Sequence, residues 1–329
     1  MVKKFIRIFL FLVVAGVAAG AYLAMAPVTP SSPKILLIKA GSSARGIAGQ
    51  LEGAGVIRNA YAFLAVHAIK GRRTLKAGEY SFDKPASAME VYERIARGDV
   101  FYHTVVIPEG YNMFDIAQAL QVSGLTTKEA FLEVARGERT LIADIDPQAP
   151  SLEGYLFPDT YHFSRTQSPR EIAAAMVRRF RQEATALGLT QNFHHIVTLA
   201  SIVEKETSVP SERPLVAGVF VNRLERRIGL ATDPSVIYAA LLAGRYRGTI
   251  YQSDLTYDSP YNTYRFSGLP PGPIANPGRA SLQAAMQPLT TDYLYFVADN
   301  KGGHRFARTL DEHNRNVSDY RRGLAAVPK

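Results

Sequence analysis

The sequence predicts an α+β protein in which an N-terminal membrane helix precedes a two-copy β/α module and a mainly helical second half with a small β-sheet. Three observations support this fold class: a long uncharged run near the N-terminus, an ungapped internal repeat, and helical spacing of apolar residues in the second half. The chain has 329 residues, so about two or three folded units are expected. Its hydrophobic content of 47 % is sufficient for well-packed cores.

The first predicted element is a membrane-spanning helix over residues 8–26. This run has 19 residues without a charge, which is about the length that crosses a bilayer as a helix. Lys3, Lys4 and Arg7 precede it, so residues 1–7 are expected in the cytoplasm and the remaining chain outside the inner membrane. A cleaved signal peptide is the alternative, but Pro27 would directly follow the cleavage site, which favours a retained anchor. The proline-containing residues 27–34 are predicted to form a short, stiff linker.

The charge and cysteine content exclude several classes of function. The chain has no cysteine, which excludes disulfides, thiolate nucleophiles and cysteine-ligated zinc. Its net charge of +9 suits an acidic polymer or an anionic lipid surface, but no basic run is dense enough to predict nucleic-acid binding. The seven histidines are scattered and form no ligand cluster, so neither a metal nor a cofactor is expected.

Residues 35–145 contain a repeat at an offset of 69 residues. Ile38-Lys-Ala-Gly41 with the following Ile47-Ala48, Leu51 and Gly55 corresponds to Ile107-Pro-Glu-Gly110 with the following Ile116-Ala117, Leu120 and Gly124. Each copy is predicted to begin with a strand, to turn at glycine and to enter an amphipathic helix. Such units resemble LysM-like glycan-binding modules; a scaffold that only positions the second half is the alternative.

A predicted helix from His195 onward carries two glutamates at its end. Ile196, Leu199, Ala200 and Val203 recur at helical spacing and predict a buried face, and Glu206 falls at the edge of that face. A carboxyl group held against apolar surface has a raised pKa and can donate a proton at neutral pH. Glu204 falls in a more polar row, and a solvated Glu-Lys-Glu helix end is the alternative reading of both residues.

The remaining second half is predicted to contain further helices, one long loop and a hairpin. Helices are expected at 169–186, at 214–226 after a Ser211 cap, and at 281–286, with Asp233 capping another. Residues 261–278 are rich in Pro and Gly and predict a rigid binding loop. Residues 292–298 are expected to form a strand that turns into Arg305-Phe306, and His313 is expected in a C-terminal helix.

Ordered motifs in residues 146–329 are similar to those of the endolytic murein transglycosylase family (YceG-like). They are Leu152-Glu-Gly-Tyr-Leu-Phe-Pro-Asp-Thr-Tyr161, Ala200-Ser-Ile-Val-Glu-Lys-Glu-Thr207, Val219-Phe-Val-Asn-Arg-Leu224, Thr232-Asp-Pro-Ser-Val-Ile-Tyr238, Tyr261-Asn-Thr-Tyr264, Gly268-Leu-Pro-Pro-Gly272, Tyr293-Leu-Tyr-Phe-Val-Ala-Asp299 and Gly302-Gly-His304. With the membrane anchor and the repeat, the resemblance covers nearly the whole chain. One departure is Ala231, where the family commonly has Gln, so a role for that amide is not carried over.

The resemblance implies a lytic transglycosylase, a carbon–oxygen lyase that cuts peptidoglycan glycan strands internally and leaves 1,6-anhydro ends. The second glutamate of Glu-Lys-Glu, Glu206, would be the catalytic acid. Candidates for orienting the sugar are Glu153, Asp233, Tyr261, Asn262 and Thr263. The implied partners are glycan strands, the membrane and cell-wall synthases. The alternatives are a muramidase-type hydrolase that pairs Glu206 with Glu153 or Asp233, and a non-catalytic, membrane-anchored glycan-binding scaffold.

Overall fold

The computed structural model describes residues 2–325, and the chain divides into two compact units. The N-terminal unit contains the chain up to Thr104 together with His162–Gln167. The C-terminal unit contains Val105–Tyr161 and the chain from Ser168 onward. This division falls within the second copy of the repeat, and the domain boundary between residues 145 and 146 stays a prediction.

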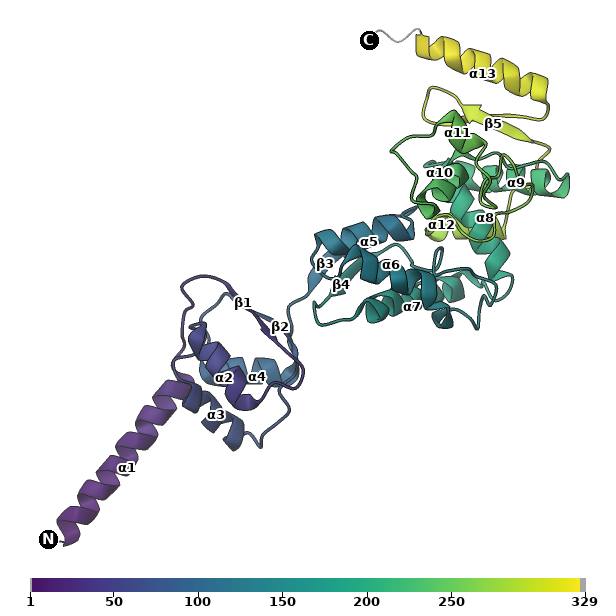
Figure 1. Cartoon of the computed structure of the whole chain (residues 1–329). Coiled ribbons are helices and arrows are strands. Elements are labelled where there is room, and N and C mark those ends of the chain that lie inside the picture. Colours follow the sequence, from purple (N-terminus) through teal and green to yellow (C-terminus); the bar gives the residue numbers. More distant parts are fainter. Residues whose placement is uncertain (1, 326–329) are drawn as a thin grey trace. The chain divides into compact units, whose positions relative to one another are not determined.

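The N-terminal unit is a strand pair packed with helices (Figure 1). Its elements are α1 (Val2–Met25), β1 (Lys34–Ile38), α2 (Ala44–Gly53), α3 (Ala60–Ile69), β2 (Gly78–Phe82) and α4 (Ala88–Arg97). Strand β1 pairs antiparallel with β2, with Leu36 opposite Tyr80. Among the described helices, α1 alone is long and apolar enough to span a membrane. The predicted linker is tied to the unit, because Val28 forms a β-bridge with Ala86.

Both copies of the repeat fold into the same order of strand, helix, helix and strand. The second copy consists of β3 (His103–Val106), α5 (Met113–Val122), α6 (Lys128–Gly137) and β4 (Thr160–Phe163), and β3 pairs with β4 as β1 pairs with β2. The helices of the two copies are capped at equivalent positions by side chains that accept hydrogen bonds from backbone N–H groups of the first turn. Ser43 caps α2 and Asn112 caps its counterpart α5. Asn59 caps α3 and Thr127 caps its counterpart α6. The closing strand β4 lies beyond residue 145, the predicted end of this module.

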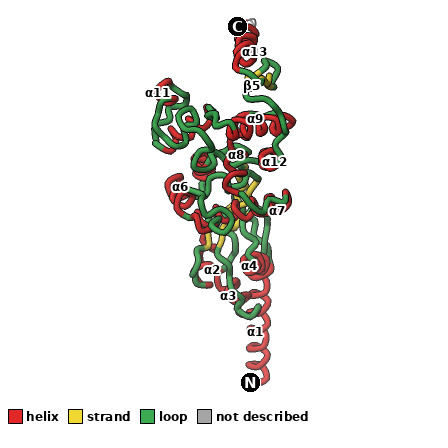
Figure 2. Tube along the Cα trace, turned by 90° about the vertical axis from the view of Figure 1, so that its right-hand side faces the viewer, coloured by secondary structure: helices red, strands yellow, loops and turns green. Residues whose placement is uncertain are grey.

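The rest of the C-terminal unit is mainly helical, and Figure 2 shows how little of it is strand. Its elements are η1 (Arg139–Leu141), α7 (Pro169–Leu187), α8 (Phe193–Glu206), η2 (Pro210–Glu212), α9 (Arg213–Glu225), α10 (Asp233–Leu242), α11 (Gln252–Leu255), α12 (Arg279–Met286), β5 (Tyr295–Ala298), β6 (His304–Ala307) and α13 (Leu310–Ala325). Strands β5 and β6 form an antiparallel hairpin, as predicted, with Phe296 opposite Phe306. The mixed helix–sheet class is confirmed, and residues 261–278 form neither helix nor strand.

Helix α8 is the central helix of this unit rather than an amphipathic surface helix. Every residue from Val197 to Val203 is buried, whereas Ile196, which was predicted to lie in the buried face, is only partly buried. Helices α9 and α12 pack against α8. The backbone N–H of Ile274 in the 261–278 loop donates to the Ser201 hydroxyl at 3.0 Å, so the polar row of α8 is also covered. The spacing of apolar residues identified only one buried face of α8, because the other buried positions include the polar residues Thr198 and Ser201.

Two predicted helix starts are wrong. Helix α9 begins at Arg213 after a short 3₁₀ turn, and its cap position is Glu212 rather than Ser211. In α10 the cap position is Thr232, so Asp233 is the first helical residue and its carboxylate is available to other partners. In both cases proline lies in the first turn, as its missing N–H allows, but no side chain caps either helix.

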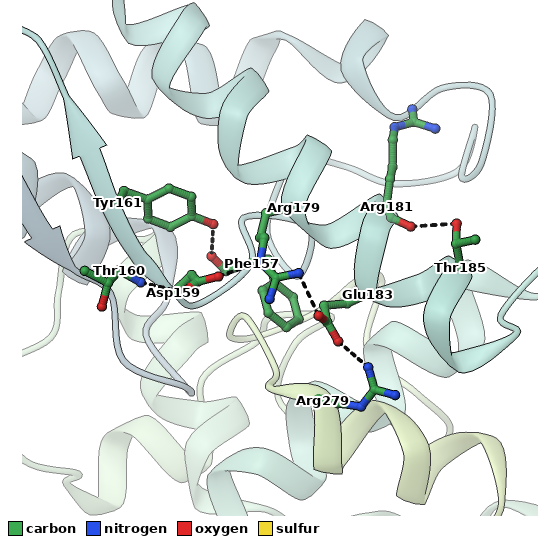
Figure 3. Close-up of polar contacts among 9 residues, drawn as sticks. All are labelled: Phe157, Asp159, Thr160, Tyr161, Arg179, Arg181, Glu183, Thr185 and Arg279. Atoms are coloured by element: carbon green, nitrogen blue, oxygen red, sulfur yellow. Dashed lines mark hydrogen bonds and ion pairs between the residues drawn. The ribbon is translucent and has the colours of Figure 1, made fainter.

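An ion-pair chain ties α7 to the start of α12 (Figure 3). Arg179 of α7 pairs with Asp159 and with Glu183, and Glu183 also accepts from Arg279 at 2.6 Å. Arg179 also lies over the ring of Phe157. Because Arg279 is the first residue of α12, these contacts hold the end of the 261–278 loop against α7.

We expect Gly154→Ala to destabilise the C-terminal unit by about 3 kcal/mol or more. Gly154 has a φ of +87°, and an added Cβ would lie 2.5 Å from Pro273 and 2.7 Å from Val197 of α8. Gly188→Ala is the matched control, because its φ of +75° is similar but nothing lies within 4 Å of the new Cβ. Its expected cost is about 1 kcal/mol, from backbone strain alone. Chemical denaturation of both variants tests this; equal losses would contradict it.

Candidate active site

Glu206, the last residue of α8, lines a cavity of about 410 Å³ in the C-terminal unit. Residues from α8, α9, the segment leading into α10, the 261–278 loop, β5 and α13 enclose it. They are Glu206, Phe220, Arg223, Leu230, Ala231, Thr232, Asp233, Tyr264, Tyr295, Phe296, Leu310 and His313. Segments far apart in sequence therefore meet around one carboxyl group.

The pKa of Glu206 is raised to about 7, mainly because burial disfavours its charged form. The negative charge of Asp233 raises it further, and the positive charge of Arg223 opposes both effects. Apolar walls from Phe220, Leu230 and Phe296 supply the low-polarity surroundings. A carboxyl group with this pKa is about half protonated at neutral pH, so it can both donate and accept a proton there.

Asp233 is held in the cavity wall by Tyr264. The Tyr264 hydroxyl donates to Asp233 Oδ1 at 2.7 Å. Burial and the Asp233 charge raise the pKa of Tyr264, so its hydroxyl keeps its proton and remains a donor. Asp233 is also the first residue of α10, where the helix dipole favours a negative charge.

Arg223 of α9 is fixed by two backbone carbonyls. Its Nε donates to the Gly229 carbonyl at 3.0 Å and its Nη1 to the Leu294 carbonyl at 3.3 Å. The guanidinium lies over the ring of Tyr295 at 5.5 Å, and Tyr295 stacks on His313 with ring centroids 5.2 Å apart. The cavity lining therefore includes a cation held in place by hydrogen bonds and a stacked pair of aromatic rings.

Glu204 has a different environment, although it lies only two residues before Glu206. Its Oε1 accepts from Arg213 Nη2 at 2.8 Å, and its Oε2 accepts from the Gly278 N–H at 2.9 Å. The two side chains of this pair are 5 % and 8 % exposed. Glu204 therefore forms a buried ion pair that attaches α9 and the 261–278 loop to α8, and it does not line the cavity.

Of the five residues predicted to orient a sugar, the structure brings Asp233 beside Glu206 but not Glu153. Glu153 is 1 % exposed and accepts from the Met113 N–H at 2.8 Å and from Asn276 Nδ2 at 2.7 Å. Burial raises the pKa of Glu153 to about 8. Glu153 therefore links α5 to the 261–278 loop from within the core.

Tyr261, Asn262 and Thr263 also lie outside the cavity lining. Asn262 Nδ2 donates to the backbone carbonyls of Leu255, the last residue of α11, and of Tyr257. Thr263 Oγ1 accepts from the Thr232 N–H at 3.0 Å. The ring of Tyr261 packs on Tyr238 with centroids 5.2 Å apart. These contacts hold the loop in shape and bring the next residue, Tyr264, into the cavity.

The residues that sequence reasoning missed lie within or beside the recognised motifs. Arg223, Tyr264 and Tyr295 each belong to a quoted motif, and His313 lies on the helix after the hairpin. Ala231 lines the cavity with a φ of +49°, which is unusual for a residue other than glycine. Motif membership was the available signal, but it did not distinguish a residue at the cavity from one that supports its wall.

This arrangement defines an acid–base site. It combines a partly buried carboxyl group whose pKa is about 7, a second carboxyl group, a fixed cation and aromatic walls. The sequence matches the YceG-like family over residues 36–319, and the chain belongs to this family. It is similar to the endolytic murein transglycosylase of Bacillus subtilis (strain 168), with 35 % identity over 86 % of this chain and 83 % of that protein.

Two further comparisons agree with this assignment. The endolytic murein transglycosylase of Streptococcus pneumoniae serotype 2 (strain D39 / NCTC 7466) is 31 % identical over 97 % of this chain, which spans 65 % of the length of that protein. A crystal structure of a yceG-like protein from Listeria monocytogenes has a TM-score of 0.56 and 34 % identity, covering 86 % of this chain and 99 % of that chain.

We expect Asp233→Asn to lower the pKa of Glu206, because it removes a negative charge that disfavours ionisation, and the shift should be about one pH unit. Carboxyl ¹³C NMR titration measures it, with Glu206→Gln identifying the resonance by its loss. An unchanged midpoint in Asp233→Asn would contradict the electrostatic coupling of these two residues.

We expect Glu153→Gln to remove part of the pH dependence of stability. The pKa of Glu153 in the folded protein, about 8, lies above the ordinary glutamate pKa of 4.5, so the stability that this group contributes is fully present below pH 4.5. It is lost as pH rises through the folded pKa, by up to about 5 kcal/mol. Denaturant midpoints across this range test the expectation: the wild type should lose more stability than the variant, and parallel losses would refute it.

Proposed function

We propose that this chain is an endolytic lytic transglycosylase that cleaves peptidoglycan glycan strands between N-acetylmuramic acid and N-acetylglucosamine. The observation that carries the proposal is the Glu206 carboxyl, whose pKa is raised to about 7 in an aromatic cavity. The names of the Bacillus and Streptococcus relatives support the same activity.

In the first step the protonated Glu206 carboxyl gives its proton to the bridging glycosidic oxygen. The bond from that oxygen to C1 of the muramyl residue breaks, and C1 acquires oxocarbenium character. Protonation must precede this step, so the raised pKa is a requirement for it. Arg223 then stabilises the Glu206 carboxylate, because its fixed positive charge favours the ionised form.

In the second step the ionised Glu206 takes the proton from the 6-hydroxyl of the same muramyl residue. The 6-oxygen forms a bond to C1, which closes the 1,6-anhydro ring and returns Glu206 to its protonated form. No water is consumed, so a paired nucleophile is not required as it is in most glycoside hydrolases. One carboxyl that titrates near neutrality can therefore complete the cycle.

The cavity walls suit a sugar ring. Tyr295 and Phe296 line the cavity and offer apolar surface to the C–H groups of a pyranose, and Asp233 and Tyr264 offer polar groups to its hydroxyls. Asp233 also supports a second candidate reaction, because it could activate water in a muramidase-type hydrolysis. A glycan-binding scaffold without catalysis is the third possibility.

We place this activity outside the inner membrane, with α1 as a retained single-pass anchor and residues 1–7 in the cytoplasm. The charge-free run of α1 and the basic residues before it support this topology. The strand–helix–helix–strand copies support LysM-like modules that hold glycan. An enzyme that ends nascent strands would work beside cell-wall synthases.

We expect Glu206→Gln to abolish glycan cleavage, because an amide cannot donate a proton to the glycosidic oxygen. Purified glycan strands and mass analysis of the products test this. The wild-type enzyme should release 1,6-anhydro ends. Reducing ends would indicate hydrolysis, and intact glycan retained on the wild-type protein would indicate binding alone.

Glu204→Gln is the matched control, because it alters a carboxyl two residues away that does not line the cavity. It weakens the pair with buried Arg213, so we expect a loss of about 1–3 kcal/mol in stability with cleavage retained. Cleavage that survives Glu206→Gln and disappears in folded Glu204→Gln would reverse the assignment.

A further inference from the structure

Helix α3 carries an apolar surface that is exposed to solvent in the N-terminal unit. Its ten residues, Ala60 to Ile69, include no Asp, Glu, Lys or Arg, and the one histidine, His67, is only partly exposed. One face is buried in the core through Phe63 and Val66. The opposite face is exposed, with Tyr61 78 % and Ile69 80 % accessible. A surface helix normally presents charged or polar residues on such a face.

The second copy of the repeat provides an internal comparison. Helix α6 is the counterpart of α3 and keeps the core side: Ala-Phe-Leu occupies residues 62–64 of α3 and residues 130–132 of α6. The exposed side differs. Tyr61, Ala65 and Ala68 of α3 correspond to three charged residues in α6, which are Glu129, Glu133 and Arg136. The two helices therefore share one core requirement but present different surfaces.

The apolar face of α3 is continuous with the last turns of α1. Between them lies a cavity of about 520 Å³ whose lining includes Val17, Ala21 and Met25 of α1 and Tyr61, Ala65 and Ile69 of α3. Arg58 Nη2 donates to the Pro27 carbonyl at 3.1 Å, and its guanidinium lies over Tyr22. These contacts, with Val28 bridged to Ala86, attach the end of α1 to the unit.

The length of α1 determines the depth of this region in a bilayer. A span that begins after Arg7 needs about 20 residues to cross the hydrocarbon, so it would end near Pro27. The stretch from Val17 to Met25 covers roughly 12 Å along the helix axis, which is most of one hydrocarbon leaflet. A helix packed against this stretch cannot remain in water when α1 is fully inserted.

We propose that the exposed face of α3 lies in the lipid of the outer leaflet beside α1, as a second membrane contact of the N-terminal unit. This rests on the proposed anchoring by α1. Basic residues at both ends of α3 support it: Arg58 precedes the helix, and Lys70, Arg72 and Arg73 follow it. Lys70 and Arg73 also pair with Glu93, each at 3.0 Å. Such side chains reach from apolar surface to anionic headgroups. Two membrane contacts would fix the orientation of the unit at the bilayer.

The full-length chain allows a direct test because it contains no tryptophan. Tyr61→Trp places a single probe on the exposed face of α3, and Glu129→Trp places one at the equivalent exposed position of α6. Both proteins are reconstituted into phosphatidylglycerol-containing vesicles with and without brominated acyl chains. We expect Tyr61→Trp to show blue-shifted emission and to lose most of its fluorescence in the brominated vesicles, while Glu129→Trp changes in neither respect.

A third protein combines Tyr61→Trp with Ala65→Glu, which introduces the charge found at the matching position of α6. We expect this protein to regain most of the lost fluorescence in brominated vesicles, because a carboxylate is costly to place in lipid. Equal, weak quenching of Tyr61→Trp and Glu129→Trp in vesicles that retain the protein on flotation would overturn the proposal. Blue-shifted emission that grows with protein concentration in detergent would overturn it too, by assigning the face to a second copy of the chain.

Failure of the anchoring proposal gives a different result, because the protein would not float with the vesicles at all. Glycan cleavage by the three proteins measures the proposed enzymatic function separately. The substitutions lie in α3 and α6, outside the cavity that contains Glu206.

Discussion

The candidate site depends on the Glu206 carboxyl group at the end of a buried helix, which forms no ion pair with any residue that the structure describes. Helix α8 ends in two glutamates with opposite environments. Glu204 pairs with Arg213 and accepts a hydrogen bond from the Gly278 N–H, whereas Glu206 lines a cavity that has apolar walls and also contains Asp233. The first contact attaches neighbouring segments to α8, and the second environment keeps a proton available near neutral pH.

Buried carboxyl groups recur in this unit, and each has a structural consequence. Glu153 joins the start of α5 to the 261–278 loop through hydrogen bonds from the Met113 N–H and Asn276 Nδ2. Its pKa is raised because burial disfavours the ionised form of this carboxyl group. Two further contacts hold the same loop: Glu204 accepts from the Gly278 N–H, and Asn262 donates to the Leu255 carbonyl at the end of α11. This loop carries Tyr264, which orients Asp233, so the core carboxyls support the cavity without lining it.

The repeat shows how two copies of one supersecondary unit can acquire different surfaces while their packing stays the same. Ala-Phe-Leu, which packs on the core side, is retained between α3 and α6 because close packing tolerates few substitutions. The exposed positions are free of that constraint and reflect each helix's surroundings. In α6 those surroundings are water, and in α3 the adjoining α1 points to lipid.

The sequence alone determined the mixed fold class, the membrane-length helix and the two copies of the repeat, and it predicted Glu206 as the candidate acid, because periodicity, charge-free length and ordered motifs are local properties. It did not determine that Val197 to Val203 of α8 are all buried, or that Glu204 forms an ion pair. It also did not separate the residues that support the cavity wall from those that line the cavity. The supporting residues are Glu153, Tyr261, Asn262 and Thr263, and the lining residues include Arg223, Tyr264 and His313. These distinctions depend on which segments meet in space. A carboxyl's protonation follows from the partners and the solvent around it, and only the tertiary structure supplies either.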